Sequence, residues 1–123
     1  MSVETKVRKV TDSDFNGAVL EPGRPAIVDF WADWCVPCRQ LDEVIDGMAD
    51  EYDGAVSFFR VDVNESGKTA SKYAVQSIPM LLFVDGGEVV DRTVGSVSRA
   101  MIEEKLRSML EARRGPADRH AKG

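Results

Sequence analysis

The most constraining feature of this chain is a short apolar run that leads, without a spacer, into a helical pattern. Residues 26–32 are almost continuously apolar, as expected of a strand buried on both faces. From Pro37 onwards the apolar residues recur at helical spacing, and Gly54 closes that helix. A second apolar run at 56–63 reads as another central strand. Such a strand–helix–strand unit implies parallel strands joined by a right-handed crossover.

The helix predicted after Pro37 has one apolar and one acidic face. Its apolar face is formed by Leu41, Val44, Ile45, Met48 and Tyr52. We expect the acidic residues between them to face water: Asp42, Glu43, Asp46 and Asp50.

The N-terminal part of the chain predicts one strand and one helix. Residues 7–10 have the composition of a short edge strand. We expect Thr11 to cap the following helix, with Asp14 in its favourable first turn. The proline-rich stretch 21–25 ends that helix.

The C-terminal part predicts a short helix, a hairpin and a last helix. The short helix lies near 69–73, and two strands at 80–84 and 88–94 flank an Asp-Gly-Gly turn, a hairpin signal. Ser98 is expected to cap the last helix. Parallel and antiparallel strands together predict an α/β fold with a central mixed sheet flanked by helices.

Length and charge predict one domain with a short tail. The 123 residues suffice for one domain, which we place at 1–112. Residues 113–123 hold four basic side chains against one acidic, and we expect this basic C-terminal tail to be disordered. The whole chain has a net charge of −5, so the other 112 residues together carry a net charge of −8. An acidic body argues against a nucleic-acid partner, because phosphate binding needs a basic face.

The chain lacks the sequence signs of export or membrane insertion. Its longest apolar stretch is far shorter than the roughly 20 residues of a spanning helix. The charged first ten residues do not resemble a secretory signal. Two cysteines, Cys35 and Cys38, cannot build a disulfide-rich secreted scaffold. We therefore expect a cytoplasmic protein without membrane contact, and a monomer.

The candidate chemistry lies in Trp34-Cys35-Val36-Pro37-Cys38, between the first central strand and its helix. A helix N-terminus favours a thiolate over a thiol. Cysteines at i and i+3 lie on the same face of the first turn, close enough for an intramolecular disulfide. Pro37 suits the first turn, where its missing N–H costs nothing. We expect Cys35 to be the exposed nucleophile with a low pKa and Cys38 to be the shielded, resolving thiol.

Three sequence blocks then carry a resemblance to the thioredoxin family. Val28-Asp29-Phe30-Trp31-Ala32-Asp33-Trp34-Cys35, Ser77-Ile78-Pro79 and Val94-Gly95 occur in the family's order. The resemblance covers residues 5–112 and implies a thioredoxin fold and a protein dithiol–disulfide oxidoreductase. A C-x-x-C near a strand–helix–strand unit is itself a known sign of this family.

The resemblance implies roles for two further positions. Asp29 interrupts an apolar strand, where a carboxylate is costly to bury. In the family the matching residue is a buried acid with a raised pKa that exchanges a proton with the resolving cysteine; the alternative is an Asp hydrogen-bonded to a turn. Ile78-Pro79 resembles the family's cis-proline loop, which pairs with a substrate strand; the alternative is an ordinary trans proline at a strand entry.

A shallow apolar groove for substrate is also implied by the resemblance. Its lining would be Trp34, Val36, Pro37, Ile78, Pro79, Val94, Gly95 and Ser96. For Val94, simple packing in the core remains an alternative.

Four residues depart from the family's pattern. Val36 stands between the cysteines in place of glycine, and Met80 replaces the threonine after the proline; both alter the surroundings of the sulfurs. Arg60 replaces a lysine, and near Asp29 its permanent charge would lower the carboxyl pKa and weaken it as a base. Glu43 replaces a helix-kinking proline, so we expect a straighter helix.

The resemblance implies a complete electron path. Cys35 attacks a protein disulfide, and Cys38 resolves the mixed disulfide with help from Asp29. No cofactor is bound; a thioredoxin reductase fed by NADPH restores the dithiol. The partners are therefore that reductase and protein disulfide substrates.

Three alternatives stay open at this point. The altered residues Val36 and Met80 leave room for a disulfide oxidase or isomerase. A non-catalytic binding module could use the same fold. A zinc site would need about four ligands, but the chain offers two thiols and a single histidine, His120.

Overall fold

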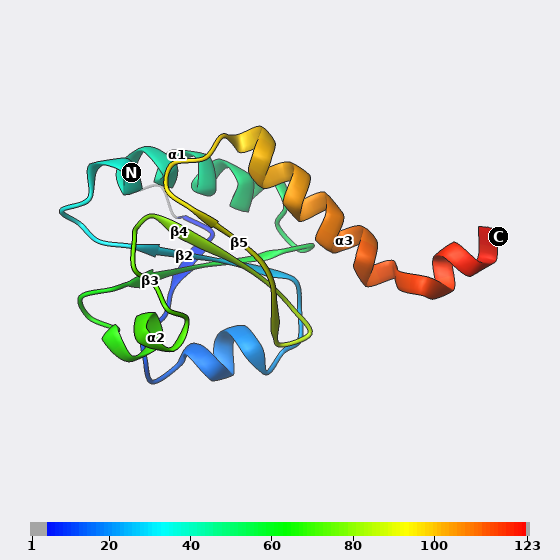
Figure 1. Cartoon of the computed structure of the whole chain (residues 1–123), viewed down its shortest axis with the longest axis horizontal. Coiled ribbons are helices and arrows are strands. Elements are labelled where there is room, and N and C mark those ends of the chain that lie inside the picture. The colour runs from blue at the N-terminus through cyan, green and yellow to red at the C-terminus, as the bar shows by residue number, and fades with distance from the viewer. Residues whose placement is uncertain (1–4, 123) are drawn as a thin grey trace.

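The computed structural model describes the backbone of residues 5–122 and the side chains up to Arg113. The chain alternates strands with helices, as Figure 1 shows. In chain order the elements are β1 (Val7–Lys9), the π-helix η1 (Asn16–Leu20), β2 (Ala26–Trp31), α1 (Val36–Glu51), β3 (Ser57–Asp62), α2 (Gly67–Lys72), β4 (Met80–Asp85), β5 (Glu88–Val94) and α3 (Arg99–Lys122). The expected α/β fold is confirmed.

A five-stranded mixed sheet in the order β1-β3-β2-β4-β5 forms the centre of the fold. β1, β3 and β2 pair in parallel, whereas β4 and β5 add antiparallel strands. The Asp85-Gly86-Gly87 turn joins β4 to β5, and both glycines have positive φ angles. Glycine adopts such angles without the steric cost that a Cβ brings, so the hairpin expected there is confirmed.

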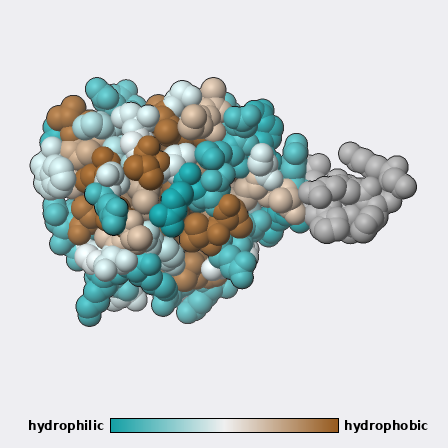
Figure 2. Space-filling model, viewed as in Figure 1, coloured by the Kyte–Doolittle hydropathy of each residue, from teal (hydrophilic) through white to brown (hydrophobic). Residues whose placement is uncertain are grey.

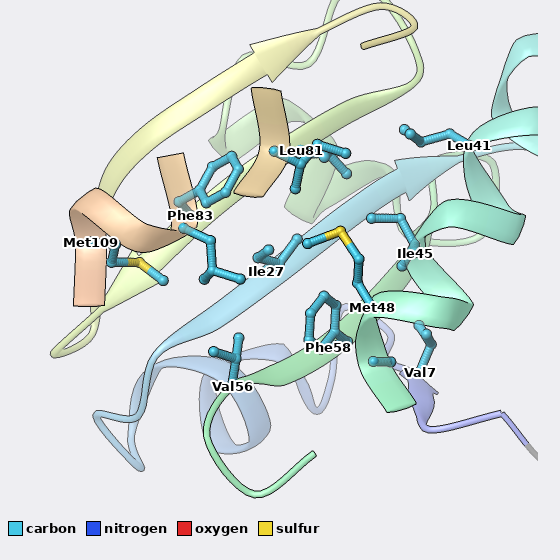
Figure 3. Packing of buried hydrophobic residues seen from close by; sticks show 13 residues of the cluster. Val7, Ile27, Leu41, Ile45, Met48, Val56, Phe58, Leu81, Phe83 and Met109 are labelled. Atoms are coloured by element: carbon cyan, nitrogen blue, oxygen red, sulfur yellow. The ribbon is translucent and has the colours of Figure 1, made fainter. Parts of the chain in front are cut away.

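One face of the sheet is covered by α1 and α3, and this layer holds the first hydrophobic cluster (Figure 1). Figure 3 shows Ile45 and Met48 of α1 pointing towards Ile27 of β2, with Phe58 and Phe83 beside them. These side chains are almost entirely removed from water. Burial of this helical stripe fixes the angle at which α1 lies on the sheet.

The opposite face of the sheet packs against η1 and α2. Its cluster includes Phe15 and Val19 from the N-terminal segment, with Phe30 and Leu82 from the sheet. Because successive strand residues point to opposite faces, β2 sends Val28 and Phe30 to this side. Ile27 and Asp29 therefore point to the α1 side.

The N-terminal helix differs from our expectation. We expected Thr11 to cap a helix around Asp14, but residues 12–14 form a turn and the regular segment is the short η1. The backbone N–H and hydroxyl of Thr11 both donate to Asp14 Oδ1. The Asp14 carboxylate thus stabilises the turn itself, a local bond that competes with regular helix.

The structure shows which residues cap α1 and α3. Cys35 is the N-cap of α1, and Pro37 lies in its first turn. Ser98 precedes α3 and its Oγ accepts from the Met101 N–H at 3.1 Å, so this predicted cap is confirmed. α1 is continuous through Glu43.

α3 crosses the boundary that we placed at residue 112. It runs from Arg99 to Lys122 and leads away from the body of the fold (Figure 1). The side chains beyond Arg113 lie outside the described part of the chain. The division into a domain and a disordered tail therefore stays a prediction, and His120 lies outside the described side chains.

Candidate redox site

Cys35 and Cys38 are joined by a disulfide at the N-terminus of α1. Their Cα atoms lie 5.3 Å apart, the spacing that one helical turn provides. The Cys38 N–H points at Cys35 Sγ at 3.3 Å. An N–H group and the positive end of the helix dipole thus stabilise negative charge on the Cys35 sulfur once the bond is reduced.

The two cysteines differ in access to solvent, but less than we expected. Cys38 is fully buried, and Cys35 is only 5% exposed in this disulfide state. Both pack in a small cluster with Ala32, and Ile78 lies against it. We expected an exposed Cys35, but neighbouring apolar side chains cover most of this residue. Cys35 is nevertheless the more accessible of the pair.

The loop before β4 faces the disulfide. The Ile78–Pro79 peptide bond is cis. The carbonyl oxygen of Ile78 lies 4.0 Å from Cys35 Sγ. Pro79 is buried, and its carbonyl accepts from the Gly95 N–H at 2.7 Å. This bond joins the Pro79 and Gly95 loops, two of the sequence blocks that are far apart in the chain.

Apolar side chains surround the disulfide at the surface. Trp34 is 63% exposed, Val36 60% and Val94 55%. Pro37 is also exposed, and Ser96 lies just beyond Gly95. Figure 2 shows hydrophobic residues interspersed with hydrophilic ones over the face seen there. Val94 does not pack in the core, because it lies on the outward face of the edge strand β5.

A hollow of about 220 Å³ continues this surface between α1 and the loop after Gly95. It is lined by Gln40, Leu41, Val44, Ser96 and Val97. The sequence alone carries no sign of this hollow. It forms only where α1 meets the loop between β5 and α3, so no local pattern signals it.

Asp29 lies on the α1 side of β2 and is fully buried. Burial raises the pKa of its carboxyl to about 7, and the Asp42 carboxylate adds to the rise, whereas the Arg60 guanidinium opposes it. Neither carboxyl oxygen has a hydrogen-bond partner among the described residues. The alternative of an Asp bonded to a turn is therefore wrong.

Arg60 lies close to Asp29, which is the condition under which we expected it to lower the carboxyl pKa. The two residues are register partners of β3 and β2, and Arg60 Nε lies 3.6 Å from Asp29 Oδ2. Arg60 lowers the carboxyl pKa, as expected, but burial is the larger effect and the pKa stays raised. The Arg60 guanidinium also lies over the Trp31 ring, with its Cζ atom 5.9 Å from the ring centre.

Asp42 corrects our expectation of a fully solvated acidic face. Its side chain is 24% exposed, and its Oδ1 lies 3.2 Å from Arg60 Nη2. Burial raises its pKa, and Arg60 opposes that rise. The sequence held a signal for this position: Asp42 is four residues after Cys38 and therefore lies on the same side of α1.

The described residues hold neither a metal-binding cluster nor a membrane-spanning helix. No group of three or more His, Cys, Asp or Glu side chains there could hold a metal ion. In the same residues, no helix is long and apolar enough to cross a membrane.

Comparison of the sequence with known proteins finds matches in one family. The family model Thioredoxin matches residues 6–108. The chain is 40% identical to Thioredoxin 1 of Nostoc sp. over 102 residues, which are 83% of this chain and 95% of the relative. It is 41% identical to Thioredoxin 2 of Chlorobaculum tepidum over 101 residues, 82% and 93% of the two chains. It is also 39% identical to the chloroplastic Thioredoxin M-type of Pisum sativum over 105 residues, 85% of this chain but 61% of that longer relative.

Proposed function

Because the chain belongs to the thioredoxin family and is a thioredoxin-type protein-disulfide reductase, we propose how its own residues divide the reaction. The observation that carries this proposal is the Cys35–Cys38 disulfide, capping α1 opposite the Ile78–Pro79 loop. The reduced pair is the electron donor, and no bound cofactor takes part in this scheme.

Cys35 is the nucleophile and Cys38 the resolving thiol. The Cys35 thiolate attacks one sulfur of a substrate disulfide, forms a mixed disulfide and releases the first substrate thiolate. The Cys38 thiol loses its proton and attacks Cys35 Sγ. The Cys35–substrate bond breaks, the second substrate thiolate leaves, and the Cys35–Cys38 disulfide forms. Each released thiolate takes a proton from solvent.

Asp29 takes the proton of Cys38. Its support is its complete burial on the side of β2 that faces α1, with a carboxyl pKa near neutrality. A base works best when its pKa lies near the working pH, because it must both accept and release the proton. The buried position of Cys38 makes direct loss of its proton to bulk water slow.

The apolar surface around the disulfide is the substrate groove. Trp34, Val36 and Val94 are large apolar side chains left exposed beside the sulfurs. In this proposal the Ile78 backbone pairs with an extended substrate segment, and Pro37, Pro79 and Gly95 complete the floor. The hollow between α1 and the loop after Gly95 offers room for one substrate side chain.

The electron supply and the compartment are proposed from the family alone. A thioredoxin reductase that draws on NADPH regenerates the dithiol, and disulfide-bonded proteins accept its electrons. We place the protein in the cytoplasm. Its relatives include both cyanobacterial and chloroplastic proteins. Localisation of the tagged protein in its own cells therefore tests the cytoplasmic assignment.

Trapping of a mixed disulfide tests the order of attack. We expect the reduced Cys38→Ser variant to form a stable mixed disulfide with insulin, through Cys35. Non-reducing gels and peptide mass analysis detect the adduct. Cys35→Ser is the matched control and should form none. Adducts on Cys38 in the control, or none on Cys35 in the variant, would contradict the assigned roles.

A further inference from the structure

A cluster of charged side chains connects the buried Asp29 to the surface. Arg60 lies at its centre, with Nε 3.6 Å from Asp29 and Nη2 3.2 Å from Asp42. The same Nη2 lies 3.6 Å from Asp46, one turn further along α1. Exposure of the carboxylates increases along this series, from none at Asp29 to 24% at Asp42 and 46% at Asp46.

As the base for Cys38, Asp29 needs a route by which its proton can leave the protein. Every reducing turnover leaves one proton on Asp29, and the residue must lose it before the next. Asp29 has no contact with solvent, so it cannot give this proton directly to water. The proton therefore needs a second titratable group on its way out.

The groups that face Asp29 leave one candidate. From β3 comes Arg60, whose guanidinium stays protonated and cannot relay a proton. From β4 comes its register partner Leu81, which does not titrate. From α1 comes Asp42, whose charge acts directly on Asp29 and whose carboxyl is partly exposed. Asp46 contacts Arg60 but has no described contact with Asp29.

We propose that Asp42 is the positioning residue through which the proton of Asp29 reaches solvent in each turnover. The inference rests on the proposed role of Asp29 as the base for Cys38. Asp42 does not touch the reacting sulfurs; it acts through Asp29. Its place four residues after Cys38 on α1 puts it beside the point where the proton is released.

The charge balance of the cluster favours such a transfer. Asp29, Asp42 and the guanidinium of Arg60 together are neutral when the two carboxyls share one proton. Passing the proton from Asp29 to Asp42 therefore moves it outwards without changing the net charge buried there. The like charge of Asp42 helps to raise the pKa of Asp29, so Asp29 can hold the proton from Cys38 until that proton passes outwards.

The proton is accounted for at every step. The Cys38 S–H bond breaks, and its proton moves to the Asp29 carboxylate while the sulfur keeps the electron pair. Asp29 passes a proton to the Asp42 carboxylate, and Asp42 releases it to water. Both carboxylates end ionised, as they began, and no oxidant beyond the substrate disulfide is needed.

The first test is single-turnover reduction of 5,5′-dithiobis(2-nitrobenzoate) by the reduced protein. Absorbance reports the first thiolate released by Cys35 and the second released by Cys38. We expect Asp42→Asn to slow the second step about tenfold at pH 7. This is less than the about 10²- to 10⁴-fold that positioned proton transfer is worth, because Asp29 is still present to accept the Cys38 proton. The first step should stay within about twofold of the parent rate.

Two variants of similar chemistry serve as controls. Asp46→Asn removes the same charge from the same helix, and the second step should keep its parent rate. Asp42→Glu retains a carboxyl and should restore most of the rate. An equal slowing in Asp46→Asn, or an unchanged second step in Asp42→Asn, would overturn the proposal.

A double-mutant cycle separates relay from structural support and from the base itself. In the Asp29→Asn background, adding Asp42→Asn should slow the second step no further, because no proton is left to relay. Equal slowing in both backgrounds would mean that Asp42 is only structural. If Asp29→Asn alone does not slow the step, the role of Asp29 fails. If Asp29→Asn slows it and Asp42→Asn does not, only the relay fails.

NMR titration of the oxidised protein gives an independent readout. Loss of the Asp42 charge should move the midpoint of the Asp29 carboxyl resonance to lower pH, while Asp46→Asn should leave it in place. An unmoved midpoint in Asp42→Asn would contradict the coupling between the two carboxyls.

Discussion

Asp29 and Arg60 lie opposite each other in the parallel pairing of β2 and β3, with 3.6 Å between Asp29 Oδ2 and Arg60 Nε. Register places them there, because both residues occupy the α1-facing positions of neighbouring strands. The pair is not a simple ion pair. Burial of Asp29 outweighs the attraction of the guanidinium, so the pKa of the carboxyl stays raised, at about 7.

Asp29→Asn should stabilise the oxidised protein at high pH. The folded-state pKa of Asp29 is about 7, against about 3.9 in an unfolded chain. Between these two pH values the folded state binds more protons than the unfolded state, so the free energy of unfolding falls as pH rises. The full cost of ionising the buried carboxyl is present above pH 7. The neutral amide should gain about 2–4 kcal/mol at pH 8 and almost nothing at pH 4. Urea denaturation at both pH values measures this, and an equal gain at both would contradict it.

Arg60→Met should raise the pKa of Asp29 further. The guanidinium is the main group that lowers it, and an apolar side chain removes that effect. The Asp29 resonance in NMR should then titrate above the parent midpoint of about 7. Arg60→Lys keeps a positive charge and should shift the midpoint less. A midpoint that falls in Arg60→Met would show that Arg60 acts in some other way.

The midpoint potential of the Cys35–Cys38 pair should be more reducing than the cytosolic glutathione pool. That pool lies at about −220 to −260 mV by extraction methods. Equilibration in graded thiol–disulfide buffers, alkylation and mass counting of blocked thiols give the value. A markedly more oxidising potential would favour an oxidase or isomerase. Val36→Gly and Met80→Thr would then show which residue near the sulfurs is responsible.

Phe83→Ala should destabilise the fold strongly. Phe83 is fully buried between the sheet and α3, as Figure 3 shows. Loss of a buried aromatic ring costs about 3–5 kcal/mol, because a cavity remains. Val90→Ala, at a half-exposed position of the edge strand β5, is the control and should change the free energy of unfolding by less than about 0.5 kcal/mol. Similar losses in the two variants would mean that this core layer is not closely packed.

Local sequence signals determined most of the fold. The apolar run of β2, the helical spacing of α1 and the Asp-Gly-Gly turn each depend on a few neighbouring residues, and the structure contains all three elements. The redox pair was also predictable, because two cysteines one helical turn apart lie at a helix start. The N-terminal helix was not, since side-chain bonds of Asp14 stabilise a turn that helical propensity does not describe.

Tertiary structure alone decided the surroundings of these residues. Helical spacing predicted that Asp42 faces the solvent, but spacing does not show which residues of other elements lie beside a helix. Packing of α1 on the sheet brings Asp42 next to Arg60 of β3. Cys35 was predicted to be exposed, and Ile78, 43 residues later, covers it. The Gly95 to Pro79 bond, the hollow beside α1 and the raised pKa of Asp29 likewise depend on contacts between distant segments. Periodicity fixes which face of an element is buried, whereas only the docked elements determine what each buried group meets.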